Sequence, residues 1–387
     1  MKKILALTLA AMMTLSMAAC GSKPATPASS APAAASSAAE TPAESAAPAA
    51  EDGKFELALI TDIGTIDDKS FNQGSWEGLK KYAEEKGISH KYYKPAEKSN
   101  DAYLSAIGLA VKGGAKVIVT PGFLFEEPVF IAQEEYPDVK FVLIDGNPHD
   151  AEYKEFKTAD NTVGIKYAEE QAGFLAGYAA VKEGYTKLGF LGGMAVPAVV
   201  KFGYGFAQGA DYAAKELKMA DGSITLNYHY TGGFDATPEA QTLAASWYQN
   251  GTEVIFGCGG AVGNSAMAAA EQAKGKVIGV DIDQSSESDT VITSAMKGLG
   301  ASVYTTLAQY YDNKFPGGQN LVFDAANDGV ALPMATSKFQ KFTQADYDKL
   351  YSALVADTDG IASKIMKDTE KTPADLPVSA VKITVVE

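Results

Sequence analysis

Short apolar runs, typical of buried strands, alternate along the chain with longer stretches whose apolar residues recur at helical spacing. Short runs of apolar and β-branched residues predict strands at 55–61, 116–120, 140–145, 187–192, 224–229, 253–257 and 276–281. Amphipathic stretches between them predict helices at 72–86, 102–112, 167–182, 200–218, 238–250 and 263–273. This alternation predicts an α/β fold built from βαβ units, with parallel sheets that are covered on both faces. It runs through the chain twice, so we expect two doubly wound domains.

The first residues have a different pattern. Lys2 and Lys3 precede an apolar run over 4–19, and the small residues Ala18 and Ala19 come directly before Cys20. The run is shorter than the ~20 residues of a membrane-spanning helix, so it predicts a signal peptide over residues 1–19. The cysteine at this place resembles the lipobox of bacterial lipoproteins, which implies that Cys20 carries lipid. A short membrane anchor that ends in an incidental cysteine is the alternative.

Residues 20–53 are nearly all Ala, Ser, Pro, Thr and Glu, a composition that predicts a disordered tether. The folded part after it is long enough for two lobes. We expect an N-terminal lobe of residues 54–158 plus about 288–325, and a C-terminal lobe of residues 159–287 plus about 326–387.

Composition narrows the classes of ligand. The chain has 387 residues, 48 Asp+Glu, 33 Lys+Arg and a net charge of -15, and all of its basic residues are Lys. An acidic chain is a poor nucleic-acid binder, and without Arg it has no guanidinium fork to hold an anion. Its 3 His and 2 Cys do not suffice for a Cys/His zinc site or a disulfide framework. We therefore expect a neutral ligand and neither metal nor cofactor.

Polar, aromatic and glycine residues follow the predicted strands. Open parallel sheets bind ligands beyond the carboxyl ends of their strands, so these residues are candidates for a binding cleft. They are Asp62, Phe123, Asp145, Gly259, Gly260 and Asp281. Gly and Asp also form ordinary strand-to-helix turns, which is the alternative explanation for each of them taken singly.

Five short motifs, in order, carry a resemblance to a known family. They are Asp67–Gln73 with Trp76–Leu79, Phe174–Gly177, Leu191–Met194 leading into Pro197 and 202–209, Gly279–Gln284, and Thr293–Lys297. The sequence resembles the basic membrane protein family, the substrate-binding lipoproteins of nucleoside ABC importers, over nearly the whole folded part. The resemblance implies a type I periplasmic-binding-protein-like fold, whose two lobes are joined by a hinge and hold the ligand in the cleft between them.

The resemblance also implies roles for single residues. It matches Phe71 and Phe202 to two rings that stack on a nucleobase, with Phe206 as the alternative second ring; Asn72 and Asp145 to the base edge; and Asp281 and Lys297 to the ribose. The chemistry is reasonable in itself, because aromatic faces suit a flat base and carboxylates suit sugar hydroxyls. Ordinary packing is the alternative for Phe202 and Phe206, and a hydrophobic staple is the alternative for Phe71.

Three further motifs resemble sites of ligand or metal binding or of thiol chemistry. Gly257–Gly263 mimics a dinucleotide fingerprint, but its glycine spacing is one residue too long. The Asp281 and Asp283 pair has no dense run of oxygen ligands around it, as calcium would need, and Asp67 and Asp68 are best explained as caps of the following helix. Cys258 is expected to be a packed, inert thiol.

Together, these patterns and the family resemblance imply a monomeric lipoprotein on the extracytoplasmic face of the membrane. It would capture a nucleoside, with purines favoured, and deliver it to an ABC permease without covalent chemistry. One alternative is an enzyme that hydrolyses or phosphorolyses nucleosides. Another is a receptor of the same fold for a simple sugar.

Overall fold

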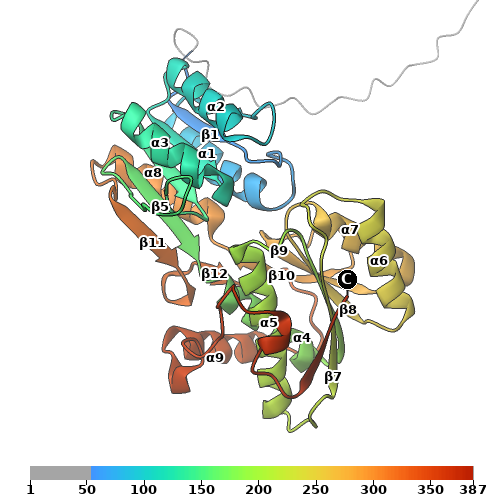
Figure 1. Cartoon of the computed structure of the whole chain (residues 1–387). Helices are drawn as coiled ribbons and strands as arrows, with labels where there is room; N and C mark the ends of the chain where they lie inside the picture. The colour runs from blue at the N-terminus through green and yellow to red at the C-terminus, as the bar shows by residue number, and fades with distance from the viewer. Residues whose placement is uncertain (1–53, 387) are drawn as a thin grey trace, which may run out of the picture. The chain divides into compact units, whose positions relative to one another are not determined.

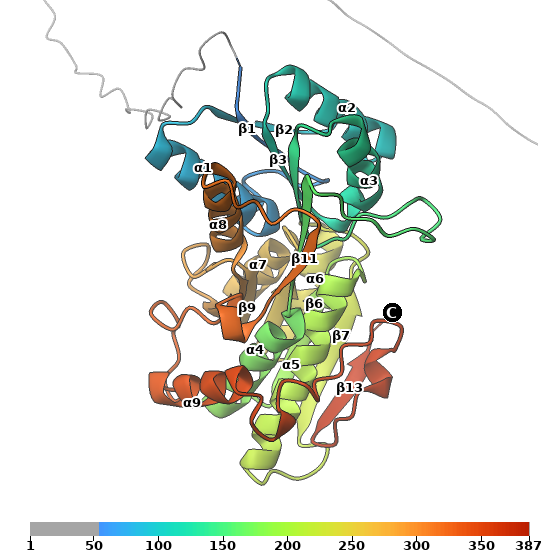
Figure 2. The ribbon, with the colours of Figure 1, turned by 90° about the vertical axis from the view of Figure 1, so that its left-hand side faces the viewer.

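Side-chain alternation along β1 (Leu57–Ile60) decides which helices cover which face of the first sheet. In the computed structural model, which describes residues 54–386, Leu57 and Leu59 pack with α1 (Phe71–Lys86) and α8 (Leu299–Tyr311). Ala58 and Ile60 point to the other face and pack with α2 (Asn100–Lys112) and α3 (Glu126–Glu135). Figure 2 shows the two helix pairs on opposite sides of the strands. The first sheet is therefore covered on both faces, as the sequence predicts.

Within the described residues the first sheet has six strands in the order β11-β5-β4-β3-β1-β2, and all their pairings are parallel. Besides β1 they are β2 (His90–Tyr93), β3 (Val117–Pro121), β4 (Lys140–Ile144), β5 (Thr162–Tyr167) and β11 (Gln319–Phe323). A short 3-10 turn, η2 (Phe123–Phe125), joins β3 to α3. We call this sheet and its four helices the first lobe (Figure 1).

The second sheet has seven strands in the order β12-β10-β9-β8-β6-β7-β13, and within residues 54–386 its only antiparallel pairing is that of β10 with β12. The strands are β6 (Lys187–Gly192), β7 (Ile224–Tyr230), β8 (Val254–Cys258), β9 (Lys276–Asp281), β10 (Val291–Lys297), β12 (Val330–Ala331) and β13 (Val381–Val385). The sheet is covered by α4 (Glu169–Glu183), α5 (Pro197–Glu216) and α9 (Gln344–Val355) on one face and by α6 (Pro238–Gln249) and α7 (Val262–Ala273) on the other. We call this assembly the second lobe.

The chain crosses between the lobes three times, and two crossings differ from the sequence-based boundaries. β5 pairs with β4 in the first sheet, so the boundary expected at 158/159 was wrong and falls after Tyr167. β10 pairs with β9 in the second sheet, so the boundary expected at 287/288 was also wrong and falls after Lys297. The third crossing lies between β11 and β12. Neither β5 nor β10 was among the strands predicted from the sequence, and the sheet that each one joins is decided by tertiary contacts.

Glycines bring α4 and α5 into direct backbone contact. A Cβ at Gly173 would lie 2.1 Å from the carbonyl oxygen of Phe202, and one at Gly205 would lie 2.0 Å from that of Glu170. No side chain fits in that space, so glycine is required at both places. The close approach sets the start of α4 beside the part of α5 that carries Phe202.

The C-terminal segment is attached to α5 by three polar residues on one side of that helix. Gln208 exchanges hydrogen bonds with the backbone of Met366, at 2.9 and 2.8 Å, and Asp211 accepts backbone N–H groups of Ser379 and Ala380 at 2.8 and 2.7 Å. Tyr204 donates its hydroxyl to the carbonyl of Lys371. β13 then extends the second sheet at its β7 edge. The helix that carries Phe202 is thus held from outside by the end of the chain.

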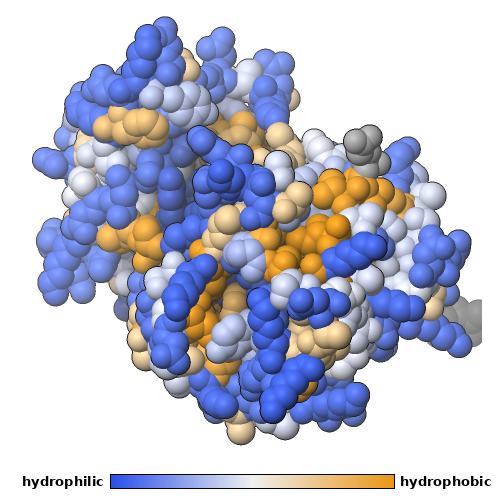
Figure 3. Space-filling view, turned by 60° about the horizontal axis from the view of Figure 1, so that its bottom comes forward, coloured by the Kyte–Doolittle hydropathy of each residue, from blue (hydrophilic) through white to orange (hydrophobic). Residues whose placement is uncertain are grey.

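Between residues 54 and 386 no helix combines the length and the apolar character that crossing a membrane requires. Figure 3 shows one face of the molecule, where hydrophilic residues surround apolar side chains gathered near the middle of the view. The predicted signal peptide, Cys20 and the tether lie outside the described residues.

Candidate functional site

A cavity of about 630 Å³ lies between the two lobes, a volume within the usual range for small-molecule sites. The predicted residues that line it are Asp62, Phe71, Asn72, Phe123, Asp145, Phe202, Gly259, Gly260, Asp281 and Lys297. They come from the ends of β1, β3, β4, β8, β9 and β10 and from the starts of α1 and α5. The residues selected at the strand ends therefore line one cavity.

Phe206 does not line this cavity. Its side chain is 0% exposed and packs on Phe256, with the two ring centroids 5.3 Å apart, inside the core of the second lobe. Phe202, one turn earlier on α5, contacts the cavity and also lies edge-on to Phe256 at 5.9 Å. Phe206, the alternative second stacking ring, therefore does not face the cavity. One turn of α5 separates it from Phe202 and places its side chain in the core.

Lys297 is the centre of a buried ionic cluster at two of the crossings. Its Nζ contacts Oδ2 of Asp145 and lies 3.3 Å from Oε1 of Glu169, and its side chain is only 2% exposed. Burial alone lowers the pKa of this lysine, but the neighbouring carboxylates Asp145, Glu169 and Asp281 outweigh burial and raise it overall. Lys297 is therefore a permanent cation in the wall of the cavity.

The same ammonium group lies over aromatic rings from both lobes. Its Nζ is 5.0 Å from the ring centroid of Phe71, 5.3 Å from that of Tyr167 and 5.5 Å from that of Phe202. These distances are within the range of cation–π attraction. Phe71 and Phe202, which come from different lobes, thus line the same cavity, and both rings lie near the ammonium group of Lys297.

Two carboxylates of the cluster are raised in pKa by burial. Burial is the main reason that the pKa of Asp145 rises to about 6, against the lowering effect of Lys297. Burial likewise raises the pKa of Asp281, which accepts a hydrogen bond from the Ser70 hydroxyl at 2.5 Å. Both aspartates have positive φ, 59° and 67°, at the ends of their strands. Their backbone conformation turns the chain sharply where the side chains reach the cavity.

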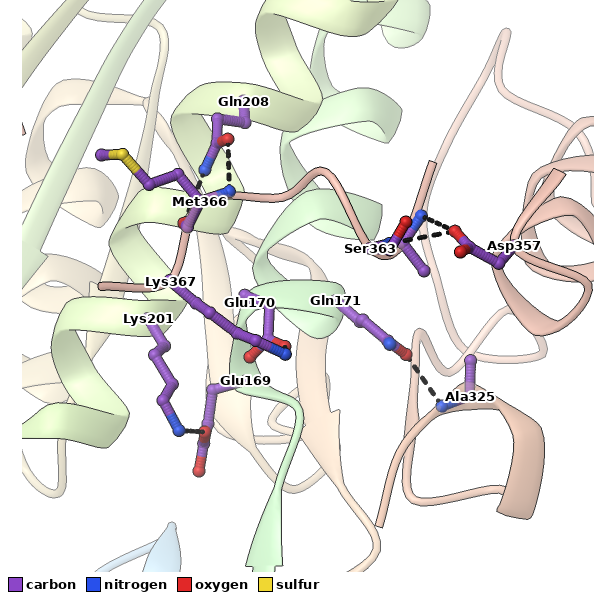
Figure 4. A network of polar contacts seen from close by, with 11 residues as sticks. Glu169, Glu170, Gln171, Lys201, Gln208, Ala325, Asp357, Ser363, Met366 and Lys367 are labelled. Carbon is purple, nitrogen blue, oxygen red and sulfur yellow. Dashed lines mark hydrogen bonds and ion pairs between the residues drawn. The ribbon is translucent and has the colours of Figure 1, made fainter. Parts of the chain in front are cut away.

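Glu169 is the most important residue that sequence reasoning missed. It starts α4, is 2% exposed, and its Oε2 lies 3.4 Å from Nζ of Lys201, which also lines the cavity. Glu170 beside it is held by Lys367 of the C-terminal segment at 3.0 Å (Figure 4). Acids in the first turn of a helix usually face solvent, but contacts with α5, Lys297 and the C-terminal segment bury Glu169 and Glu170.

The wall of the first lobe holds a second polar network. Asp68 accepts the backbone N–H groups of Ser70, Asn72 and Gln73 at 2.9, 2.9 and 3.1 Å. It therefore caps the start of α1, as the sequence indicates. The amide of Asn72 bridges Asp68 and Asp62, so its place in the cavity wall is fixed by two carboxylates.

The glycine turn between β8 and α7 belongs to the cavity as well. Gly259 and Gly260 have φ of 127° and 52° and lie against Phe234, an aromatic residue of the cavity wall that the sequence analysis did not select. Cys258 is 1% exposed, and burial raises the pKa of its thiol well above the ordinary value. The thiol is packed, as expected. In residues 54–386 no group of three or more His, Cys, Asp or Glu residues could hold a metal ion.

Two sheets of mainly parallel strands, three crossings and a cavity between the lobes define a type I periplasmic-binding-protein-like fold. The chain belongs to the Bmp family: the model described as "ABC transporter substrate-binding protein PnrA-like" matches residues 55–375. The protein is accordingly a substrate-binding protein of the ABC transporter class, which binds a small molecule and works with a permease. Proteins of this class are not enzymes.

Individual relatives agree with this assignment. The chain is 30% identical over 310 residues to the "ABC transporter nucleoside-binding protein BmpA" of Lactococcus lactis, covering 74% of this chain and 84% of the relative. It is 31% identical over 311 residues to "Basic membrane protein A2" of Borrelia garinii, covering 79% and 87%. A solved solute-binding protein of an ABC transporter system from Aeropyrum pernix superposes with a TM-score of 0.64 at 23% identity, covering 81% and 83%, which supports the fold.

Proposed function

We propose that this protein captures a nucleoside, with purines favoured, and delivers it to the permease of an ABC importer. The observation that carries the proposal is the placement of Phe71 and Phe202, from opposite lobes, around one cavity that also contains Lys297 and Asp281. Two rings can hold a base between them, and a buried carboxylate can accept hydrogen bonds from paired ribose hydroxyls. The name of the Lactococcus relative supports the same class of ligand.

A thermal-shift screen against nucleosides, free bases and simple sugars tests the proposal. A nucleoside at 100 times its Kd is expected to stabilise the protein by about 2.7 kcal/mol, because only the folded state binds it. Free bases and ribose, which each fill half of the site, are expected to shift the melting temperature much less. Stabilisation by a sugar alone would favour the sugar receptor, a reading that the aromatic pair argues against.

Substitutions in the two halves of the site separate base from sugar recognition. Phe71→Ala is expected to weaken binding by about 1–3 kcal/mol, the value of one stacked base. Asp281→Ala is expected to weaken it at least as much, since it removes a desolvated acceptor. Phe206→Leu serves as the matched control, because that ring is in the core and lies outside the cavity wall. A sugar receptor would tolerate Phe71→Ala.

The enzyme alternative is tested by incubating the pure protein with inosine and adenosine and measuring free base, with and without phosphate. We expect no turnover, because Asp145 and Glu169 are paired with Lys297 and Asp281 accepts the Ser70 hydroxyl, so no carboxylate of the cluster is set up as an acid or base. Release of base that scales with protein and disappears in Asp281→Ala would establish an enzyme.

We also propose that the protein is a monomer anchored by lipid on Cys20 at the extracytoplasmic face of the membrane. The position of Cys20 after an apolar run and two small residues supports this. Metabolic labelling with a fatty acid is expected to mark the full chain and to leave Cys20→Ala unlabelled and released from membranes. Equal labelling of both would contradict the anchor.

A further inference from the structure

The edge of the base is recognised by whatever hydrogen-bonding capacity the cavity wall leaves free beside Phe71. Asn72 follows Phe71 directly, and an amide there could donate to a base or accept from it. Both of its N–H donors are already used. Its Nδ2 donates to Oδ1 of Asp62 at 3.0 Å and to Oδ2 of Asp68 at 2.9 Å, and its Oδ1 faces the backbone N–H of Asp62 at 3.4 Å.

Asp68 has no free oxygen either. Its Oδ1 accepts the backbone N–H groups of Ser70 and Gln73, and its Oδ2 accepts both the backbone and the side-chain N–H of Asn72. Asp68 is also buried, with 9% of its surface exposed. It therefore orients Asn72, and through Asn72 it orients Asp62.

Asp62 keeps one oxygen for the cavity. Its Oδ1 accepts the N–H of Gly64 at 2.9 Å as well as Nδ2 of Asn72, while its Oδ2 has no hydrogen bond to any residue of the described range 54–386. Gly122 leaves this oxygen room, since a Cβ there would come within 2.9 Å of it. Next to Phe71, Asp62 thus offers a fixed acceptor, and the donors of Asn72 are taken.

The donors elsewhere on the cavity wall are differently placed. Lys297 and Lys201 are paired with carboxylates. Lys94 and Tyr153 are exposed, Lys166 lies at the end of β5, and Asn264 belongs to the second lobe. The Thr65 hydroxyl is bonded to Asp67. None of these residues is adjacent in sequence to Phe71 or bonded to the Asp62 network. The acceptor character of that wall is therefore local and built in.

We propose, on the basis of the nucleoside-binding function above, that Asp62 selects 6-oxopurine nucleosides, inosine and guanosine, over adenosine. A 6-oxopurine carries a proton on N1 and can donate it to Oδ2 of Asp62. Guanosine adds the 2-amino donor, which suits a carboxylate. Adenosine presents the N1 lone pair in the same place, so two acceptors would face each other. A charge-assisted hydrogen bond of this kind corresponds to roughly 10- to 100-fold in Kd.

The test is calorimetric titration of the full folded protein with a matched set of ligands. Guanosine and inosine are expected to bind at least about 10-fold more tightly than adenosine. 1-Methylguanosine, which lacks the N1 proton, is expected to lose that advantage. 7-Deazaguanosine keeps N1–H and the 2-amino group and is expected to retain it. Equal binding of guanosine, 1-methylguanosine and adenosine would overturn the selection by Asp62 while leaving nucleoside binding intact.

The second arm changes the protein. Asp62→Asn keeps an oxygen for Gly64 and Asn72 and places an N–H₂ donor where Oδ2 was. The ratio of the adenosine Kd to the guanosine Kd is expected to fall at least about fivefold, by the loss of one charge-assisted bond. An unchanged ratio would overturn the proposal. Should this variant fail to fold, the ligand series on the wild-type protein decides alone. Failure of every nucleoside to bind would remove the proposed function itself, and this inference with it.

Discussion

Two parts of the cavity wall stabilise buried carboxylates in different ways. On the first lobe, Asp62 and Asp68 are surrounded by neutral N–H donors of the backbone and of Asn72. At the crossings, Asp145 and Glu169 share one ammonium group, that of Lys297. The first arrangement distributes its support over several donors, and the second concentrates it in a single side chain.

The difference matters for both stability and motion. A network of several donors loses one hydrogen bond at a time, whereas removal of Lys297 leaves several buried charges uncompensated. The lysine also joins two of the three crossings, because it ends β10 just before Gly298 and pairs with Glu169 just after β5. The lysine that lines the cavity therefore also forms the ion pair that joins two of the crossings between the lobes.

Lys297→Met is expected to give the largest effect. It should lower the free energy of unfolding by about 3–5 kcal/mol, because it breaks a buried ion pair from one side. Chemical denaturation measures this, and titration should show loss of nucleoside binding. Lys80→Met is the control, since Lys80 pairs with Glu84 on the exposed side of α1 at 3.8 Å, where about 0.5 kcal/mol is expected. Equal effects of the two variants would show that the buried ion pair stabilises the protein no more than an exposed one.

Asp145 should make stability depend on pH in a distinctive direction. Burial raises its folded-state pKa to about 6, above the ordinary 3.8, so the folded protein holds this proton more firmly than the unfolded chain. Its contribution is fully present below the ordinary pKa and is lost as pH rises through about 6. From pH 4 to 7 the wild type should lose roughly 2–3 kcal/mol relative to Asp145→Asn.

Denaturation of both proteins at each pH isolates this group, since Asp62, Asp68 and Asp281 titrate in both. Parallel pH curves for the wild type and Asp145→Asn would show that Lys297 keeps Asp145 ionised throughout. In that case the attraction of Lys297 would favour the charged form of Asp145 by more than burial disfavours it. The two parts of the cavity wall would then differ even more in their dependence on a single cation.

Asn72→Ala tests the distributed network and should have a smaller effect. Asp62 and Asp68 each lose one donor but keep their backbone N–H partners, so a loss of about 1–2 kcal/mol in unfolding free energy is expected. Asn100→Ala, which removes an exposed amide bonded to Glu127, is the control and should stay within about 0.5 kcal/mol. A loss as large as that of Lys297→Met would mean that this wall too depends on one residue.

Lys367→Met should give the smallest change and one that depends on salt. Lys367 is 60% exposed and pairs with Glu170, whose side chain is 2% exposed, at 3.0 Å. We expect a loss of about 1 kcal/mol in dilute salt that shrinks in concentrated salt, because an exposed ammonium is screened. Glu170→Gln in the same chain should cancel most of the loss. A salt-independent loss that the second substitution does not relieve would point to packing instead.

The strands and helices of the two lobes were largely predictable. β6 and β9 have the predicted bounds, and α1, α6 and α7 begin or end within about two residues of them. These elements have regular periods, and each buries the face that the period indicates. The strands β5, β10, β11, β12 and β13 and the helices α3, α8 and α9 were not predicted. β11 and β13 are mostly exposed and β12 has only two residues, so their apolar patterns are weak. β5 and β10 are buried, but Gly164, Thr293 and Ser294 interrupt their apolar patterns.

Residues of the candidate site that follow strand ends could be selected from the sequence. Those whose place depends on helix packing could not. Asp62, Asp145 and Asp281 follow buried strands, so topology alone brings them to one edge. Glu169 becomes a site residue because α4 packs closely on α5 and its carboxylate meets Lys201 and Lys297. Phe206 is outside the cavity because its ring packs on Phe256 in the core. Neither outcome can be read from the local pattern around those residues.

By itself the sequence determined the α/β class, the two-lobed plan, the cleft at the strand ends and the resemblance to the Bmp family. Local periodicity and short motifs encode these features, and they need no knowledge of distant contacts. The tertiary structure alone decided which sheet β5 and β10 join, which phenylalanine faces the cavity, and which carboxylates share Lys297. Those outcomes depend on desolvation and close packing between segments far apart in the chain, where burial changes both the partners and the charge state of a side chain.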